Sequence, residues 1–320
     1  MARTMGCALL LALAAIGCSG ADPAPRSADP APPGERVQAA RSHLLAARLQ
    51  SALASETDAD RAVQLRDNLA RLALAPLPEG RHVLVDLAAA RLYLMNGDRI
   101  EGAMAVVVGS PRDPTPLLDT EIVRLVARPY WNVPLDLAQR RMASEVVRYG
   151  PRWLAARGME TLNPNQETPQ LLPASAIDWR AVAKGQAEAR IRQRPGHGNM
   201  MGSMKFELRN GKGIYLHDSP ERQYFAHEQR ALSAGCIRLS DWKQLADWLW
   251  DGALPDGDGR PEQYLELETP VPIRIVYLTL SPLGVDGWLP AGTLARQPDP
   301  YGLDQKRALA RTPDSRGLPS

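Results

Sequence analysis

The spacing of apolar residues changes at Arg81, and this change constrains the fold more than any other feature of the chain. Before Arg81 apolar residues recur at helical spacing, whereas after it they form short runs of the kind found in strands. Asn96-Gly97 is a strong signal for a tight hairpin between two such runs. Strands are predicted at residues 83–87, 91–95, 100–108, 122–127, 204–208, 213–216 and 271–280. Many short strands with few helices predict a β-rich (α+β) fold.

The same pattern divides the chain into segments. A helix-rich insert is expected to interrupt the β-rich domain, with its first helix over residues 137–158, and a further helix is expected at 240–251. The Pro- and Gly-rich end of the chain is predicted to be loosely ordered. The expected segments are a signal peptide (1–18), a disordered linker (19–35), a helical N-terminal region (36–78), the β-rich domain (79–280, with the insert at 137–195) and a C-terminal tail (281–320).

The first 18 residues are typical of an export signal. Arg3 precedes an apolar run, residues 5–16, that is too short to span a bilayer, which takes roughly 20 residues. Ala15-Ile16-Gly17-Cys18 resembles a lipoprotein cleavage site, in which the cysteine is lipidated. We therefore expect an exported, periplasmic protein anchored to a membrane through Cys18, with plain cleavage and no lipid as the alternative.

Cysteine usage singles out one thiol. The chain has three cysteines: Cys7 lies within the signal, Cys18 carries the expected lipid, and Cys236 remains. A single thiol in an oxidising compartment is either reactive or an intermolecular partner, although a buried, inert thiol is the alternative. The formal net charge is only +2, with acidic and basic residues interleaved, so nucleic acid is not an expected partner.

His217 and Cys236 are the candidate catalytic pair. A thiol is a weak nucleophile at neutral pH, and a neighbouring imidazole can take its proton. His217 ends a predicted strand, which would hold its ring rigidly, and Gly235 lets the backbone turn so that N–H groups converge as an oxyanion hole needs. Arg238 offers a fixed positive group for a carboxylate. Sequence alone does not show that the imidazole and the sulfur meet.

The motifs around these residues resemble a known family. His217 followed by Ser233-x-Gly235-Cys236-x-Arg238 is similar to the active-site signature of the YkuD-type L,D-transpeptidase catalytic domain. Further blocks, in the same order as in its YcbB-like subgroup, extend the resemblance over residues 68–280. They are Arg91-Leu92-Tyr93, Val106-Val107-Val108-Gly109, Pro114-Thr115-Pro116, residues 129–134, Arg194-Pro195-Gly196, Asn199, Gly202, Lys205-Phe206 and residues 215–220.

The resemblance implies a fold and a set of roles. The implied fold is a YkuD-like mixed β-sandwich whose helical insert caps the site. Cys236 would attack the stem tetrapeptide of peptidoglycan, and His217 would act as base and then acid. The remaining implied roles are orientation of His217 by the backbone carbonyl of Asp218, an oxyanion hole from the N–H groups of Ala234, Gly235 and Cys236, and substrate binding by Arg238, Ser233, Asn199 and Tyr215. Carbapenem-type inhibitors are implied ligands, and no cofactor is.

Several alternatives stay open at this stage. The acceptor of the acyl group could be a diaminopimelate side-chain amine, a lipoprotein, a free D-amino acid or water, the last giving a carboxypeptidase- or endopeptidase-type hydrolase. A non-catalytic wall-binding lipoprotein is a rival, because Ala234 departs from the polar residue common in the family and the N-terminal region is short. No metal-ligand spacing occurs, so no metal site is expected. His197, in a Gly-rich loop, is the one other histidine considered for the cleft.

Overall fold

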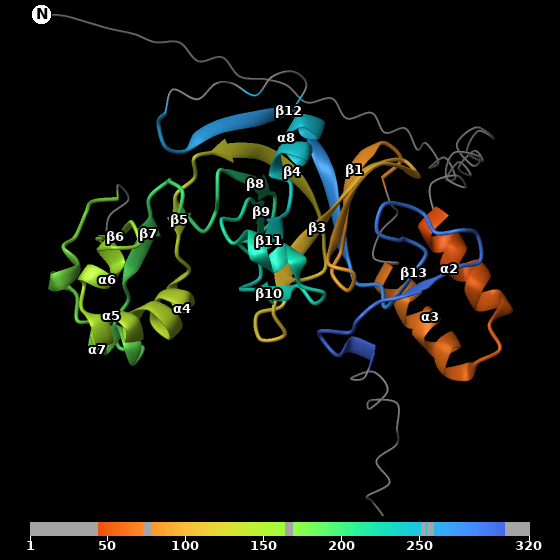
Figure 1. Ribbon diagram of the computed structural model, residues 1–320, viewed down its shortest axis with the longest axis horizontal. Coiled ribbons are helices and arrows are strands. Elements are labelled where there is room, and N and C mark those ends of the chain that lie inside the picture. The colour runs from red at the N-terminus through yellow and green to blue at the C-terminus, as the bar shows by residue number, and fades with distance from the viewer. Residues whose placement is uncertain (1–43, 73–77, 164–168, 251–253, 255–258, 305–320) are drawn as a thin grey trace, which may run out of the picture. The chain divides into compact units, whose positions relative to one another are not determined.

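A computed structural model describes residues 44–72, 78–163, 169–250, 254 and 259–304 (Figure 1). The expected signal peptide, the lipidation site Cys18, the linker and the first residues of the helical region lie outside this part. None of the described helices is long and apolar enough to cross a membrane.

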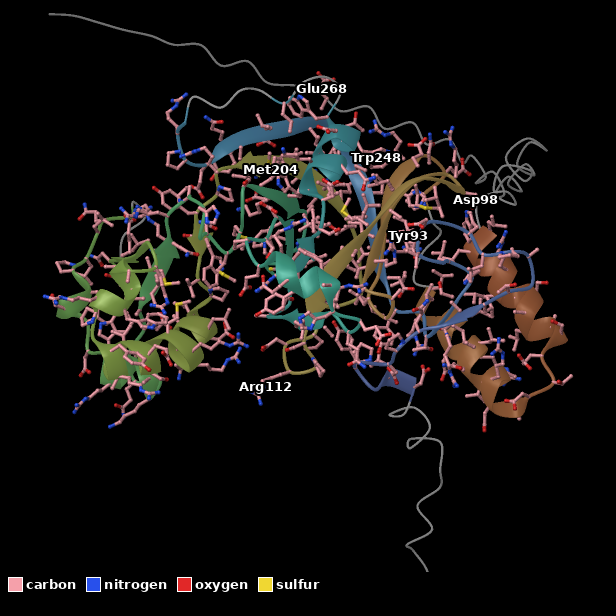
Figure 2. All side chains as sticks on the ribbon, in the orientation of Figure 1. Tyr93, Asp98, Arg112, Met204, Trp248 and Glu268 are labelled. Carbon is pink, nitrogen blue, oxygen red and sulfur yellow. The ribbon has the colours of Figure 1, made fainter. Side chains whose placement is uncertain are left out.

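Two helices come first, α2 (Leu44–Ser55) and α3 (Ala59–Leu72). The carboxylate of Asp58 accepts a hydrogen bond of 2.7 Å from the N–H of Arg61 and so caps α3. Leucines of both helices pack on an apolar face of the sheet that includes Tyr93, which is labelled on that side of the sheet in Figure 2. The helical N-terminal region thus covers one face of the sheet.

Nine strands of the described residues form one sheet in the order β10-β3-β11-β9-β8-β4-β12-β1-β2. Its strands are β1 (Arg81–Asp86), β2 (Arg91–Asn96), β3 (Arg99–Gly109), β4 (Leu118–Ala127), β8 (Met204–Leu208), β9 (Tyr215–His217), β10 (Ala231–Ser233), β11 (Ile237–Leu239) and β12 (Gln263–Val276). The first half of β3 pairs with β2, and its second half pairs with β10 and β11. The sheet therefore closes on itself, and the predicted β-rich fold is confirmed.

The main core lies inside this closed sheet. Helix α8 (Trp242–Leu249) buries Leu245, Ala246 and Leu249 against it. On the outer side of α8, Trp248, labelled in Figure 2, donates its indole N–H to Glu101 of β3 at 2.9 Å. The amphipathic pattern of this helix explains why its position could be predicted from the sequence.

The insert forms a lobe with a core of its own. It contains β5 (Trp131–Asn132), α4 (Leu135–Leu137), a π-helical turn (Ala138–Met142), α5 (Ala143–Tyr149), α6 (Arg152–Ala155), β6 (Met159–Leu162), a 3-10 turn (Ala174–Ala176), α7 (Trp179–Ala183) and β7 (Arg190–Gln193). The strands pair in the order β5-β7-β6. One continuous helix over residues 137–158 is wrong, because Gly150, with a φ of 79°, ends α5 before Pro151.

The C-terminal segment is ordered up to residue 304, so the expectation of a loose tail is wrong for this stretch. Its strands are β13 (Leu280–Ser281) and β14 (Ala295–Arg296), which pair with each other. Leu283 is fully buried against α2 and α3, and the ring of Tyr301 stacks on that of Tyr277 at 5.3 Å. Aromatic and aliphatic anchors, spaced too widely to give a periodic pattern, order this segment.

Candidate active site

Cys236 lies in the short turn between β10 and β11, and the side chain of Ser233 holds this turn. The hydroxyl of Ser233 donates to the carbonyl of Cys236 at 2.6 Å and accepts from the N–H of Gly235 at 3.2 Å. Gly235 has a φ of 112°, a region that favours glycine. The turn therefore presents the sulfur in one fixed orientation.

Cys236 is half-buried as a residue. Its thiol donates to the carbonyl oxygen of Gly213 at 3.7 Å, and the backbone N–H of Tyr215 hydrogen-bonds to the sulfur. Burial raises the pKa of the thiol, while the Tyr215 N–H and then the positive charges of Arg238 and Lys205 oppose this rise. Burial is the largest of these influences, so the resting group is a neutral thiol.

His217 is the last residue of β9 and is buried, with 4% of its surface exposed. Its Nδ1 donates to the carbonyl oxygen of Asp218 at 2.5 Å, so Nε2 is left as the basic nitrogen. Burial, followed by the charge of Arg238, lowers the pKa of His217 to about 4. The imidazole is therefore neutral at pH 7 and available to accept a proton.

The carbonyl that orients His217 is itself held in place. Asp218 donates its N–H to the carbonyl of Met204, and its carboxylate accepts a bond of 2.9 Å from the N–H of Ser203. A Cβ on Gly202 would lie 2.4 Å from that carboxylate, so only glycine fits there. This close packing fixes the tautomer and the ring plane of His217.

Strand pairing brings the imidazole and the sulfur to one cavity. In the parallel pair of β9 and β11, His217 is opposite Arg238, two residues after Cys236. Both His217 and Cys236 line a cavity of about 160 Å³. The insert and its base also contribute to the lining of this cavity, through Trp131, Asn132, Leu137, Arg141, Met142 and Met201. A thiol and a neutral imidazole therefore line one cavity together with side chains of the insert, an arrangement that suits acyl transfer.

A family model described as the YkuD L,D-transpeptidase catalytic domain matches residues 80–273. The chain belongs to the YkuD family. A Haemophilus influenzae protein, provisionally named an L,D-transpeptidase, is 27% identical over 236 residues, which are 71% of this chain and 45% of that protein. The chain thus spans a little under half the length of this relative.

Solved structures of L,D-transpeptidases are also similar to the chain. L,D-transpeptidase 3 from Mycobacterium tuberculosis, with a faropenem-derived adduct, is 12% identical, with 62% of this chain and 60% of that chain covered and a TM-score of 0.30. The enzyme from Mycobacterium smegmatis is 15% identical, with 61% and 59% covered and a TM-score of 0.29. The LD transpeptidase LdtMt1, solved with imipenem, is 13% identical, with 62% and 59% covered and a TM-score of 0.29.

The YkuD site has a smaller set of candidate oxyanion donors than the sequence led us to expect. The N–H of Gly235 is already bonded to the hydroxyl of Ser233. Within the described part of the chain, the N–H groups of Ala234 and Cys236 have no acceptor. The expected set of three N–H groups is therefore corrected to these two. Because only backbone atoms take part, the alanine at position 234 is compatible with this role.

The four expected substrate-binding residues divide into two groups. Arg238 and Tyr215 line the cavity of this YkuD domain with their side chains. Arg238 also pairs with the carboxylate of Glu221 at 2.5 Å, and Tyr215 carries the Lys205 ammonium over its ring at 4.9 Å. Both remain candidates for contacts with substrate.

Ser233 and Asn199 have structural roles, which corrects that expectation. The hydroxyl of Ser233 is used inside the turn that carries Cys236, called the nucleophile turn below for the role proposed for Cys236. Asn199 is buried, and its amide donates to the carbonyls of Pro129, Gln193 and Arg194 while its oxygen accepts from the N–H of Met201. A fully engaged side chain at the base of the insert holds the two ends of the insert together and has no group left for substrate.

Three residues near the YkuD site had no role assigned from the sequence. Lys205 is paired with His217 across β8 and β9 and contributes a buried positive charge. The hydroxyl of Thr115 donates to the carbonyl of Gly235 at 2.7 Å. Tyr301 accepts from the N–H of Thr115. Thr115 and Lys205 lie in sequence blocks that resemble the family, and this resemblance could have indicated their roles. Tyr301 lies beyond the matched residues, so there was no such indication for it in the sequence.

The other described histidines, His82, His197 and His227, do not line the cavity of Cys236 and His217. His197 lines a separate cavity of about 720 Å³ with Arg222 and Lys243, beside the start of α8. The ring of His227 packs edge-on against Tyr224 at 5.9 Å. Within the described ranges, no group of three or more histidine, cysteine, aspartate or glutamate side chains is placed to hold a metal ion.

Proposed function

We propose that this YkuD-family chain is a peptidoglycan L,D-transpeptidase with Cys236 as nucleophile and His217 as general base. The observation that carries the proposal is the shared cavity of the thiol and a neutral imidazole whose Nε2 is left as the basic nitrogen. A base that is neutral at the working pH can take the thiol proton as sulfur attacks.

The reaction proceeds in two balanced halves. The sulfur of Cys236 bonds to the carbonyl carbon of diaminopimelate in a stem tetrapeptide, and the thiol proton passes to Nε2 of His217. The peptide bond to the terminal D-Ala breaks, and the leaving amine takes that proton. An acceptor amine then attacks the thioester, gives its proton to His217, and displaces the sulfur, which is protonated again. The N–H groups of Ala234 and Cys236 stabilise the negative oxygen of each tetrahedral intermediate.

The insert lobe supports an amine acceptor over water. It supplies the apolar residues Trp131, Leu137 and Met142 to the lining of the cavity that Cys236 also lines, and an apolar lining limits the entry of water. The side-chain amine of diaminopimelate on a neighbouring stem is therefore the acceptor we favour. The same chemistry with water would make the protein an L,D-carboxypeptidase or endopeptidase, which is the principal alternative.

Three finer assignments belong to the same proposal. Membership of the YcbB-like subgroup is supported by the ordered blocks that include residues 129–134 and 215–220. Export, residence in the periplasm and a lipid on Cys18 are supported by the leader-like first 18 residues. Inhibition by carbapenems is supported by the nucleophile itself, because a thiolate that attacks an amide carbonyl also opens a β-lactam ring.

The test uses the full chain, purified in detergent, with disaccharide-tetrapeptides as substrate and mass spectrometry of the products. Cross-linked dimers with release of D-Ala are expected from the wild type, and neither product is expected from Cys236→Ala. Disaccharide-tripeptide without dimer would identify a hydrolase. Unchanged substrate, together with a thiol that imipenem does not acylate, would support a non-catalytic wall-binding protein instead.

A further inference from the structure

The C-terminal segment reaches the nucleophile turn through a closed ring of hydrogen bonds. Tyr301 donates its hydroxyl to the carbonyl of Gly109 at 2.8 Å and accepts from the N–H of Thr115 at 3.2 Å. The hydroxyl of Thr115 accepts from the N–H of Gly109 at 2.8 Å and donates to the carbonyl of Gly235 at 2.7 Å. Both side chains are buried, with exposed fractions of 8% for Tyr301 and 3% for Thr115. Every polar atom of the two side chains is thereby used.

The carbonyl of Gly235 belongs to the same peptide unit as the N–H of Cys236. A peptide unit is planar and trans, so its C=O and N–H point in opposite directions. Fixing the carbonyl on one side therefore aims the N–H on the other, towards the position where negative charge develops. A hydrogen bond to the carbonyl also polarises the unit and strengthens its N–H as a donor.

The loop between Gly109 and Thr115 is packed too closely to move independently of this ring. A Cβ on Gly109 would lie 2.3 Å from the carbonyl oxygen of Asp113 and 2.4 Å from the nitrogen of Thr115. Tyr301 is held in turn by its ring stack on Tyr277 and by a bond from its own N–H to the Tyr277 hydroxyl at 3.0 Å. The position of Thr115 is thus set by a residue near the end of the described chain.

We propose that Thr115 and Tyr301 are positioning residues that orient the Gly235–Cys236 peptide unit as an oxyanion donor. The C-terminal segment, which lies outside the matched residues 80–273, is then part of the catalytic apparatus of this protein. This inference rests on the proposed function, in which Cys236 is the nucleophile.

Two reactions of the Cys236 sulfur can distinguish orientation of the oxyanion donor from a purely structural role of Thr115 and Tyr301. Imipenem acylates a thiolate through a tetrahedral oxyanion, with a sulfur–carbon bond formed, the lactam carbon–nitrogen bond broken and the nitrogen protonated. Iodoacetamide alkylates the same thiolate by displacing iodide, and no oxyanion forms. Loss of oxyanion orientation therefore slows the first reaction and spares the second.

The experiment measures both rates on Cys236 in the full chain. Tyr301→Phe and Thr115→Val should lower the first-order acylation constant on the order of 10- to 100-fold, with the alkylation rate within about twofold of the wild type. Thr115→Ser, which keeps the hydroxyl, should restore acylation. Tyr93→Phe is the matched control, because the buried Tyr93 donates a similar bond of 2.8 Å to the carbonyl of Gly284, away from the nucleophile turn. It should acylate like the wild type.

The outcomes that overturn the inference are distinct from those that overturn the function. Acylation of Tyr301→Phe and Thr115→Val at the wild-type rate, or a parallel fall in both acylation and alkylation, would rule out an oriented oxyanion donor. A wild-type protein that imipenem fails to acylate would instead remove the proposed function on which the inference rests.

Discussion

The charges around Cys236 distinguish this site from an ion-paired thiol protease. Burial raises the pKa of the thiol and lowers that of His217, so both groups are neutral at rest. The closest positive charges, Arg238 and Lys205, act on both groups in the direction that opposes an imidazolium and favours a thiolate. The proton therefore transfers during attack on the substrate and not before it.

The alkylation rate of Cys236 should reflect this neutral pair. Because iodoacetamide reacts with the thiolate, the rate should rise steadily with pH towards the raised pKa of the thiol, with no plateau near pH 6. Arg238→Gln should move the profile to higher pH, since a charge that stabilises the thiolate is lost. His217→Gln should leave the profile above pH 7 nearly unchanged. A plateau at acidic pH that disappears in His217→Gln would show a preformed ion pair and contradict this assignment.

The stability of the protein should depend on His217 between pH 6.5 and about 4. In this interval the unfolded chain binds a proton on this residue, with its ordinary pKa of 6.5, and the folded chain does not. Folding therefore becomes less favourable as the pH falls, by about 1.4 kcal/mol per pH unit for one proton. Denaturant unfolding of wild type and His217→Gln should differ by this slope.

Other buried groups do not obscure that difference. Burial lowers the pKa of His82, which acts in the same direction, and raises the pKa of Asp86 to about 7, which acts in the opposite direction. Both groups are present in the two proteins, so their contributions to the pH dependence of the unfolding free energy cancel in the comparison. Equal slopes in wild type and His217→Gln would mean that the imidazole is charged in the folded state.

At the scale of elements, the insert lobe depends on the residue at its base. Asn199 joins the segment before β5 to the segment after β7 through bonds to Pro129, Gln193 and Arg194. Arg140 and Asp113 also form an ion pair of 3.0 Å, but the Arg140 side chain is 38% exposed, so this pair contributes little to stability. The buried amide is therefore the main polar tie at the base of the lobe.

Asn199→Ala should loosen the lobe without unfolding the sheet. Three buried carbonyls and one N–H would lose their partner, at a cost of about 1–3 kcal/mol for each group left unsatisfied. Faster hydrogen exchange in residues 131–193 is expected, together with a larger share of hydrolysed product, since water would enter the cavity more readily. Asn210→Ala, which removes amide bonds to Leu208 and Ile214 in a surface turn, is the matched control. Wild-type exchange in the lobe of Asn199→Ala would contradict this role.

The elements that the sequence predicted well are those with a clear local period. The strand at residues 204–208 has the predicted limits, and the predicted hairpin is present with its two-residue loop one position later, at Gly97-Asp98, because alternation and turn chemistry act locally. Strands β10 and β11 were missed, since three residues on each side of Cys236 are too few to show a period. The insert was predicted as mainly helical, and its small sheet of two- and four-residue strands was missed for the same reason.

At the scale of the whole molecule, the two ends of the described chain stabilise each other. Arg71 of α3 pairs with Asp304 at 2.9 Å, and Gln64 donates to the same carboxylate. The amide of Asn68 donates to Thr279 at 3.1 Å. These contacts join α3 to the C-terminal segment, and both pack on the face of the sheet that carries Tyr93.

The two residues that share the candidate cavity, His217 and Cys236, were named from the sequence, and the ties between distant segments were not. His217 and Cys236 stand in a dense motif, whereas Tyr301 meets Gly109 across 192 positions of the chain. Such pairings depend on the finished fold, and a single sequence carries no local signal for them. For this reason the order of residues 281–304 was missed by a prediction that rested on composition.

Ending the chain after Ser281 should lower the free energy of unfolding by about 3–6 kcal/mol. The estimate follows from the loss of the buried Leu283 and Tyr301, at roughly 1.5–3 kcal/mol for each side chain. A chain ending after Asp304 keeps these contacts and is the control. Denaturant unfolding of both forms tests the estimate, and equal stability would show that the C-terminal segment does not contribute to the folded unit.

The most direct test of the central claim is the mass of the enzyme during turnover. Wild-type protein mixed with disaccharide-tetrapeptide and quenched in acid should carry a disaccharide-tripeptide as a thioester, found by proteolysis on the peptide that contains Cys236. The Cys236→Ala variant should carry none and form no product. Product formed by Cys236→Ala, or an acyl group found on any other residue of an active wild type, would contradict the assignment of Cys236 as the nucleophile.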